Sequence, residues 1–191
     1  MPEHTITTKD RILRAAKDLF AAEGYATVSV RRIASKADLS PAAIYRHFKN
    51  KNALLSVIRD EGFEQLRKNI TEAPKNLSAE ELVFQICYDY VSFAINNPDY
   101  YNLMFVVDMQ DAEPPTEDST PMRSYRTFEN VIENYCTQGH ICSPDGKIAA
   151  LGIWSALHGL ASLILRNRTR PFGDDIDVDA QIKTILKFIL R

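Results

Sequence analysis

The sequence predicts an all-α protein of about nine helices. Apolar residues recur every three or four positions along most of the chain, which is the spacing of one helix face. Serine and threonine precede several of these segments, and glycine or proline follows them, as at helix ends. No stretch alternates apolar and polar residues convincingly, as a β-strand does. The 191 residues suit one large domain or two small ones.

The first three helices are short and clearly delimited. Thr8 can cap the first, and Gly24 ends it in the left-handed conformation that glycine adopts past a helix. Ser29 can cap the second helix and Ser40 the third. Pro41 then occupies the first helical position, where its missing N–H has no cost. Three short helices with tight turns therefore open the chain.

Longer helices are expected after this point. The residues Ser78–Glu81 match a capping box, in which serine and glutamate bond to each other's backbone N–H groups. Loops are expected at residues 111–121, which hold three prolines, and at residues 166–178. The predicted helices span about residues 51–73, 79–97, 98–109, 122–138, 147–166 and 179–190.

The net charge of −2 conceals a division along the chain. Residues 1–59 hold eleven basic and five acidic side chains, whereas residues 60–191 hold twelve basic and twenty acidic ones. A basic first third on an acidic body indicates that only the first part meets a polyanion.

Composition also limits the cellular setting. No run of eighteen apolar residues exists, so we expect no membrane-spanning helix and no membrane partner. The N-terminus lacks the apolar core of a signal peptide, so a cytoplasmic location is the default. The three cysteines are Cys87, Cys136 and Cys142, and this odd, sparse set argues against a disulfide framework.

Residues 29–51 are the most informative stretch. They predict two short helices joined by a tight turn at Ala37–Leu39, with phosphate-seeking side chains on the second helix and just after it. This is the physical pattern of a helix-turn-helix DNA reader. The polar side chains concerned are Tyr45, Arg46, His47, Lys49 and Lys51.

These residues resemble the DNA-binding signature of the TetR family. The resemblance rests on residues 29–34 and 40–54, and residues 21–27 fit the family's first helix and turn. It covers roughly residues 8–58. In the second part of the chain, Trp154–Gly159 resembles the Trp…His-Gly element of one class of TetR-type effector domains.

The resemblance implies an all-α homodimeric repressor rather than an enzyme, with no cofactor. Residues 1–58 would form the helix-turn-helix domain that binds double-stranded operator DNA. Residues 59–191 would bind a small effector and form the dimer, through helices near residues 147–166 and 179–190. We expect a palindromic operator and an apolar or aromatic effector that releases the DNA.

The resemblance also implies which residues contact DNA. Tyr45 and His47 match positions that bond the DNA backbone, and Arg46 is the best candidate for reading guanine, because its planar fork fits two acceptors. Two positions depart from the family pattern, since Asp38 and Ala42 stand where glycine is common. Aspartate tolerates left-handed geometry, so the turn should survive. The candidate DNA-binding residues are Ser29, Arg31, Ser40, Pro41, Ala42, Ala43, Tyr45, Arg46, His47, Lys49 and Lys51.

The middle of the chain is rich in aromatic residues and methionine, which can line an apolar pocket. A dense core is the alternative for any one of these residues. Trp154 and His158 lie four residues apart and so share one helix face. His158 could equally be a hydrogen-bonded core residue. The candidate effector-binding residues are Tyr88, Phe93, Tyr101, Met104, Phe105, Tyr125, Phe128, Trp154 and His158.

Other function classes fit less well. The four histidines are scattered, and neither a catalytic Ser/His/Asp spacing nor a glycine-rich phosphate loop occurs. Cys136, His140 and Cys142 permit a metal- or thiol-sensing regulator, but their spacing fits no common zinc pattern. An adaptor whose helix-turn-helix no longer binds DNA is a further alternative, and the retained Tyr45, His47 and Lys51 speak against it.

Overall fold

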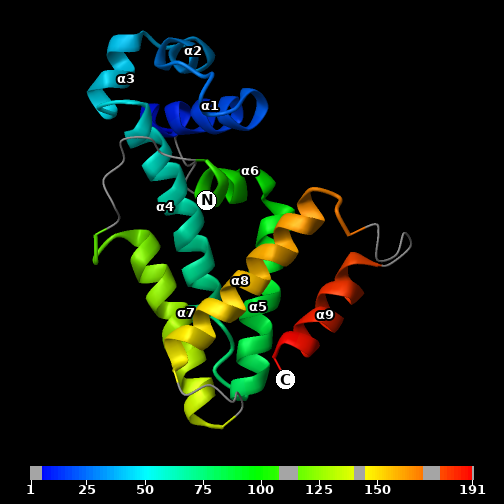
Figure 1. Ribbon diagram of the computed structural model, residues 1–191. Helices are drawn as coiled ribbons and strands as arrows, with labels where there is room; N and C mark the ends of the chain where they lie inside the picture. The colour runs from blue at the N-terminus through cyan, green and yellow to red at the C-terminus, as the bar shows by residue number, and fades with distance from the viewer. Residues whose placement is uncertain (1–5, 108–115, 140–144, 170–176, 191) are drawn as a thin grey trace, which may run out of the picture. The chain divides into compact units, whose positions relative to one another are not determined.

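A computed structural model describes residues 6–107, 116–139, 145–169 and 177–190 (Figure 1). Within these ranges the chain forms nine α-helices and one π-helical turn and has no strand, which confirms the all-α prediction. The chain divides into two compact units. The N-terminal unit holds the residues up to Gly62 and the segment from Asp99, and the C-terminal unit holds Phe63–Pro98 and the residues from Pro115 onwards.

The N-terminal unit begins with helices α1 (Thr8–Glu23), α2 (Val30–Lys36) and α3 (Pro41–His47). The predicted caps of α2 and α3 are confirmed. The Ser29 hydroxyl accepts a hydrogen bond from the Arg32 N–H at 3.3 Å, and the Ser40 hydroxyl accepts one from the Ala43 N–H at 3.2 Å. The cap of α1 is Thr7 rather than Thr8, because Asp10 completes a capping box with Thr7.

Two turns adopt positive φ in this unit. Gly24, just past α1, has φ +82°, and Asp38, between α2 and α3, has φ +54°. The aspartate therefore takes the left-handed conformation for which the related family commonly uses glycine. The core of the three helices consists of aliphatic and aromatic side chains from each of them, including Ile12, Leu19, Phe20, Val28, Ile33, Ile44 and Phe48.

Helix α4 (Lys51–Thr71) starts in the N-terminal unit and ends in the C-terminal unit. The short helix α6 (Pro98–Tyr101) continues into a π-helical turn, η1 (Asn102–Val106), so the single α-helix predicted for residues 98–109 is wrong over Asn102–Val106. Residues 108 and 109 of that prediction lie outside the described residues. Leu103 of η1 joins the N-terminal core. Gly62 of α4 lets η1 approach closely, because a methyl group in its place would overlap the Met104 sulfur.

The C-terminal unit contains α5 (Ala79–Asn96), α7 (Thr120–Thr137), α8 (Gly146–Leu165) and α9 (Val178–Ile189). Helix α5 packs against α7, α8 and α9, and α7 also packs against α8 (Figure 1). The predicted capping box of Ser78 and Glu81 is confirmed. Asp145 caps α8, which begins at Gly146, one residue before the predicted start.

Candidate DNA interface and effector site

Helix α3 buries one side and exposes the other. Ile44 and Phe48 are 1% and 4% exposed, because residues four apart share a helix face and this face meets the core. Tyr45 is 57% exposed, and Arg46 and His47 are exposed beside it. Tyr45 therefore lies on the exposed side of α3 and not on the side that meets the core. Pro41 and Ala42 are also exposed and Ala43 is half-buried, so the start of the helix is accessible.

Ser29 and Ser40 serve as helix caps and remain exposed at the starts of α2 and α3. In each cap the hydroxyl oxygen accepts a backbone N–H. A hydroxyl also carries a donor hydrogen, which a phosphate oxygen could accept. The starts of both helices also present N–H groups and a partial positive charge. Capping is therefore compatible with phosphate binding at these two positions.

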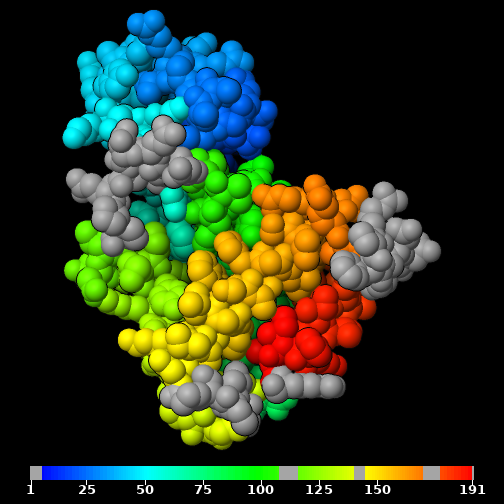
Figure 2. Space-filling model, in the orientation of Figure 1, coloured from blue at the N-terminus to red at the C-terminus, as the bar shows by residue number. Residues whose placement is uncertain are grey.

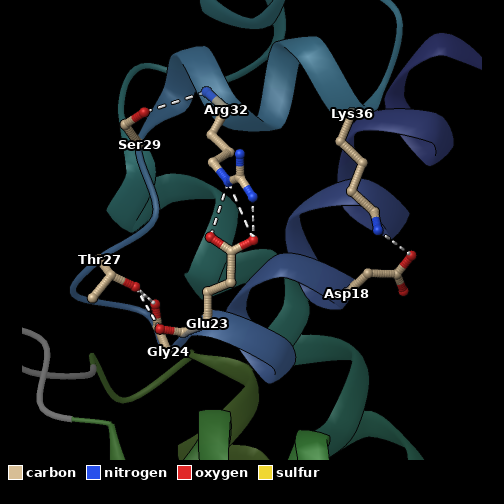
Figure 3. A network of polar contacts seen from close by, with 7 residues as sticks. All are labelled: Asp18, Glu23, Gly24, Thr27, Ser29, Arg32 and Lys36. Atoms are coloured by element: carbon tan, nitrogen blue, oxygen red, sulfur yellow. Dashed lines mark hydrogen bonds and ion pairs between the residues drawn. The ribbon is translucent and has the colours of Figure 1, made fainter.

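Neighbouring arginines on α2 differ in their contacts, and Figure 3 shows those of Arg32. Arg32 donates three hydrogen bonds to the Glu23 carboxylate of α1, with Nε–Oε2 at 2.9 Å, Nε–Oε1 at 3.2 Å and Nη2–Oε1 at 2.7 Å. This guanidinium lowers the pKa of the Glu23 carboxyl. One turn further along α2, the Lys36 ammonium lies 3.5 Å from Asp18. Arg31 is exposed and forms no hydrogen bond or ion pair with the part of the chain that the structure describes. The same holds for Arg46 within those ranges.

Lys51 has a structural contact that sequence reasoning missed. Its ammonium donates to the carbonyl oxygens of Tyr25 at 2.7 Å and Ala26 at 3.4 Å, and it lies 4.2 Å from the Tyr25 ring centre. Burial lowers the pKa of this lysine. The contact ties the start of α4 to the loop between α1 and α2. By contrast Lys49 is exposed, without an ion pair to any described residue.

In the C-terminal unit, four side chains form an aromatic cluster. The His158 ring stacks on Trp154 with centroids 5.1 Å apart at 21°, and Tyr125 of α7 meets Trp154 edge-on at 6.2 Å. The Tyr90 hydroxyl lies 2.7 Å from His158 Nδ1. Burial lowers the pKa of His158, which favours the neutral imidazole. Tyr90 was absent from the candidate set, although it lies at helical spacing on α5.

The remaining effector candidates are divided between the two units. Tyr101, Met104 and Phe105 lie on α6 and η1 in the N-terminal unit. In the C-terminal unit Phe93 is buried on α5 and Phe128 is half-buried on α7. The structure brings Tyr125, Trp154 and His158 together. The roles of the other candidates stay predictions.

Tyr88 is bonded within the C-terminal unit. Its hydroxyl donates to Asp179 Oδ1 at 2.5 Å, and Lys183 lies 2.7 Å from the same carboxylate. These bonds lower the pKa of Asp179, with the lysine as the larger cause. Tyr88 therefore links α5 to α9.

The alternative of metal or thiol sensing gains no support from the described residues. Among them, no group of three or more histidine, cysteine, aspartate or glutamate side chains could hold a metal ion. Cys136 is half-buried, and His140 and Cys142 lie outside those residues. Burial raises the pKa of Cys87 to about 12, which disfavours the reactive thiolate.

Helices α8 and α9 expose large apolar side chains. Ile148 and Leu151 of α8 are 62% and 47% exposed, and Phe188 of α9 is 77% exposed. Both helices lie at the face of the C-terminal unit seen in Figure 2. Among the described helices α8 alone is long and apolar enough to cross a membrane, which was not expected from the sequence. One such helix is weak support for a membrane span, because core helices share this composition.

The chain matches two parts of one protein family. Residues 12–58 match the family described as "Bacterial regulatory proteins, tetR family", and residues 83–187 match "Tetracyclin repressor-like, C-terminal domain". The probable transcriptional regulator YttP of Bacillus subtilis is 29% identical over 136 residues, which cover 70% of this chain and 62% of that protein. The chain thus matches less than two thirds of that relative's length.

Solved structures share the whole fold. A tetR-family regulatory protein from Rhodococcus RHA1 superposes with a TM-score of 0.73 at 26% identity, covering 97% of this chain and 96% of that one. The regulator FadR from Bacillus subtilis, in complex with stearoyl-CoA, superposes with a TM-score of 0.73 at 17% identity, covering 94% and 96%. At that identity the second likeness shows the fold alone. With both halves matched, the chain belongs to the TetR family of bacterial transcriptional regulators.

Proposed function

We propose that this regulator is a repressor that binds a palindromic operator as a homodimer and is released by a small effector. The observation that carries the proposal is the set of exposed side chains on α2 and α3. Arg31 and Arg46 are exposed and have no partner among the described residues, while Arg32 beside them is held by Glu23. A guanidinium without a protein partner is available for the paired acceptors of guanine or for a phosphate.

The candidate set, apart from Lys51 with its bonds to the loop carbonyls, supports contact with double-stranded DNA. Phosphates would be bound by Ser29 and Ser40 at the helix starts, by Tyr45 and His47, and by Lys49 through its charge. Bases would be read from Arg31, Arg46 and the small residues at the start of α3. One short helix covers few base pairs, so two copies about 34–36 Å apart would be needed to read a palindrome.

The apolar surface of α8 and α9 supports the homodimer. From Ile148 to Leu165 the sequence of α8 has no lysine, arginine, aspartate or glutamate. Exposed leucine, isoleucine and phenylalanine on neighbouring helices favour burial against a second protein surface. We therefore assign this surface to a second copy of the chain rather than to a membrane. A cytoplasmic protein follows from that assignment.

The aromatic cluster around Trp154 supports an effector site. Aromatic rings with a tyrosine hydroxyl and a neutral imidazole suit an apolar or aromatic ligand with one polar group. The stearoyl-CoA of the FadR structure makes fatty acyl thioesters one class to test. A ligand releases DNA only if it binds the DNA-free conformation more tightly. Helix α4 continues from one unit into the other. We infer that the DNA-free conformation differs by a tilt of this helix, which ligand binding would favour.

The test of DNA binding uses the matched pair of arginines on α2. Labelled DNA from upstream of the protein's own gene is titrated with wild type, Arg31→Ala and Arg32→Ala while fluorescence anisotropy is recorded. We expect Arg31→Ala to weaken binding about tenfold or more and Arg32→Ala to change it by less than about twofold. Equal effects of both variants, or no preference of wild type for this DNA over random DNA, would contradict the proposal.

The test of the effector site uses the single tryptophan of the chain. Trp154 fluorescence is followed while candidate acyl thioesters and aromatic compounds are added, and the same compounds are added to the protein–DNA complex. A compound that changes the fluorescence should release the DNA at matching concentrations. If every compound that binds leaves operator affinity unchanged, release by an effector is wrong.

A further inference from the structure

A groove lies within the C-terminal unit, where the start of α5 meets the last turns of α7 and α9 (Figure 1). These three helix ends surround a cavity of about 730 Å³, a volume that suits a small organic molecule. Leu77, Phe84 and Leu190 give it an apolar lining, and Tyr135 of α7 adds a second aromatic side chain. Its described lining shares no residue with the aromatic cluster.

The charged groups of this lining are two carboxylates and one ammonium, a net charge of −1. Glu80 is exposed and forms no hydrogen bond or ion pair with any described residue. Glu81 accepts hydrogen bonds from the Ser78 N–H at 2.8 Å and the Ser78 hydroxyl at 2.7 Å. These bonds lower the pKa of Glu81, so its carboxylate stays ionised. Lys187 of α9 is exposed and has no ion pair within the described ranges.

The electrostatic balance of the groove favours a cation. Burial is the first cause that raises the pKa of the Tyr135 hydroxyl, and the charge of Glu80 is the next. A charge acts on a neighbouring pKa over a short distance, so the Glu80 carboxylate lies toward α7 and the groove. Lys187 opposes a cation, but it lies in the last turn of α9, where the helix carbonyl groups carry a partial negative charge that offsets it.

We propose that this groove binds an organic cation, in which an ammonium or alkylated heteroaromatic group is attached to an apolar body. The cationic group would lie beside Glu80 and Glu81, and the apolar body would contact the leucine and phenylalanine side chains of the lining. Aromatic side chains add to the preference, because their ring faces attract cations. The site is additional to the effector site proposed around Trp154 and does not depend on it.

A ligand in the groove would also connect two helices. The first turn of α9 is already bonded to α5, through Asp179 and the Tyr88 hydroxyl. The groove lies at the last turn of α9, beside Lys187 and Leu190. A bound cation would therefore hold α9 against α5 at its second end, and it should raise the unfolding temperature of the protein.

Two dyes with nearly the same ring system test the requirement for a positive charge. Thioflavin T is a cation, and its analogue without the N-methyl group of the benzothiazole ring is neutral. The double variant Glu80→Gln with Glu81→Gln removes both carboxylates, while glutamine can still complete the helix cap. In fluorescence titrations of the full chain without DNA, it should bind thioflavin T about tenfold or more weakly. Its affinity for the neutral analogue should change by less than about twofold.

A variant with the opposite expectation is Lys187→Met, which removes the opposing charge and should strengthen thioflavin T binding by about twofold. The control is Glu129→Gln, which removes a carboxylate whose charge acts on Tyr125 of the aromatic cluster, and it should leave both dyes unaffected. Circular dichroism shows whether each variant is folded.

Three results would overturn the inference. In the first, wild type does not bind thioflavin T. In the second, the double variant binds it as well as wild type does, or loses both dyes equally. In the third, Glu129→Gln weakens thioflavin T binding as much as the double variant does, which would place the dye at the aromatic cluster. None of these results bears on operator binding, which is measured separately.

Discussion

The two units of the molecule hold their candidate residues in opposite ways. In the N-terminal unit Arg31 and Arg46 are exposed without partners, and similar neighbours such as Arg32 are bound to acidic side chains. In the C-terminal unit Trp154 and His158 are stacked on each other, the Tyr125 ring packs against Trp154, and the Tyr90 hydroxyl is hydrogen-bonded to His158. The candidate DNA-binding side chains can therefore be told apart from their neighbours by their exposure and their lack of ion pairs. An aromatic effector site cannot be told apart in this way, because the side chains of a hydrophobic core also pack against one another.

The largest effect is expected from changes to the apolar surface of α8 and α9. In the proposed dimer this surface joins two copies of the chain, so that both α3 helices can bind one operator. Leu151→Asp combined with Phe188→Asp places charges on that surface and should give a monomer at micromolar concentration. Affinity for the palindrome should then fall by about a thousandfold, toward non-specific binding. Analytical ultracentrifugation and anisotropy titration measure the two effects. The control is Lys147→Ala, at an exposed charged position of α8. Monomers that keep full operator affinity would refute the dimer.

The proposed base contact of Arg46 provides the next largest effect. Arg46→Ala should cost about 1–3 kcal/mol of operator binding and relax the preference at one base pair. His47→Ala, on the same exposed surface, should instead weaken all sequences to a similar extent, because a phosphate contact carries no base preference. Binding to a set of operators with single base changes measures both variants. A uniform loss for Arg46→Ala would make it a phosphate contact.

Variants of Lys51 and Lys49 allow a hydrogen-bonded lysine to be compared with an exposed one. Lys51→Met removes two bonds to loop carbonyls and should lower the unfolding free energy by roughly 1–2 kcal/mol. Lys49→Met should leave stability within about 0.5 kcal/mol and flatten the salt dependence of DNA binding by about one unit. Urea denaturation followed by circular dichroism measures the first effect, and anisotropy over a salt series measures the second. A stability loss confined to Lys49→Met would reverse the assignment.

The sequence predicted well what depends on near neighbours. The helix starts at Ser29, Ser40 and Ser78 follow from a cap and the residues just after it. The start of α1 was misplaced by one residue, because Thr7 and Thr8 are both good caps and only the Asp10 side chain separates them. The all-α class follows from periodicity in the same way.

What the sequence did not reveal are contacts between distant residues. The bond from Lys51 to Tyr25 spans 26 positions and that from Tyr88 to Asp179 spans 91, so no local pattern encodes them. The π-helical turn was missed because its apolar spacing over five residues resembles that of an α-helix. The Trp154–His158 stack could be predicted from the sequence, since residues four apart share a helix face. The hydrogen bond between His158 and Tyr90 of another helix could not be predicted.

The hydrogen bond between Tyr90 and His158 allows a direct comparison of the two units, because one tyrosine hydroxyl is bonded in the aromatic cluster and another is exposed on α3. Tyr90→Phe removes the hydroxyl beside His158 Nδ1 and should cost about 1 kcal/mol of stability. It should also change Trp154 fluorescence, because His158 stacks on that ring. The matched control is Tyr45→Phe, whose hydroxyl is on the exposed face of α3 and whose loss should leave stability unaltered. If Tyr90→Phe changes neither stability nor fluorescence, the bond does not organise the cluster.

The smallest effect expected is the pH dependence due to His158. Burial places its folded-state pKa below the ordinary value of 6.5, so between the two values the unfolded chain binds more protons than the folded one. Stability should therefore decline as the pH falls through 6.5 and stop declining below the folded-state value. Urea midpoints measured above and below this range should differ for wild type, and the difference should shrink in His158→Gln, which cannot titrate. Acid-induced loss of the same size in both proteins would assign the pH dependence to other groups and leave His158 without a role in it.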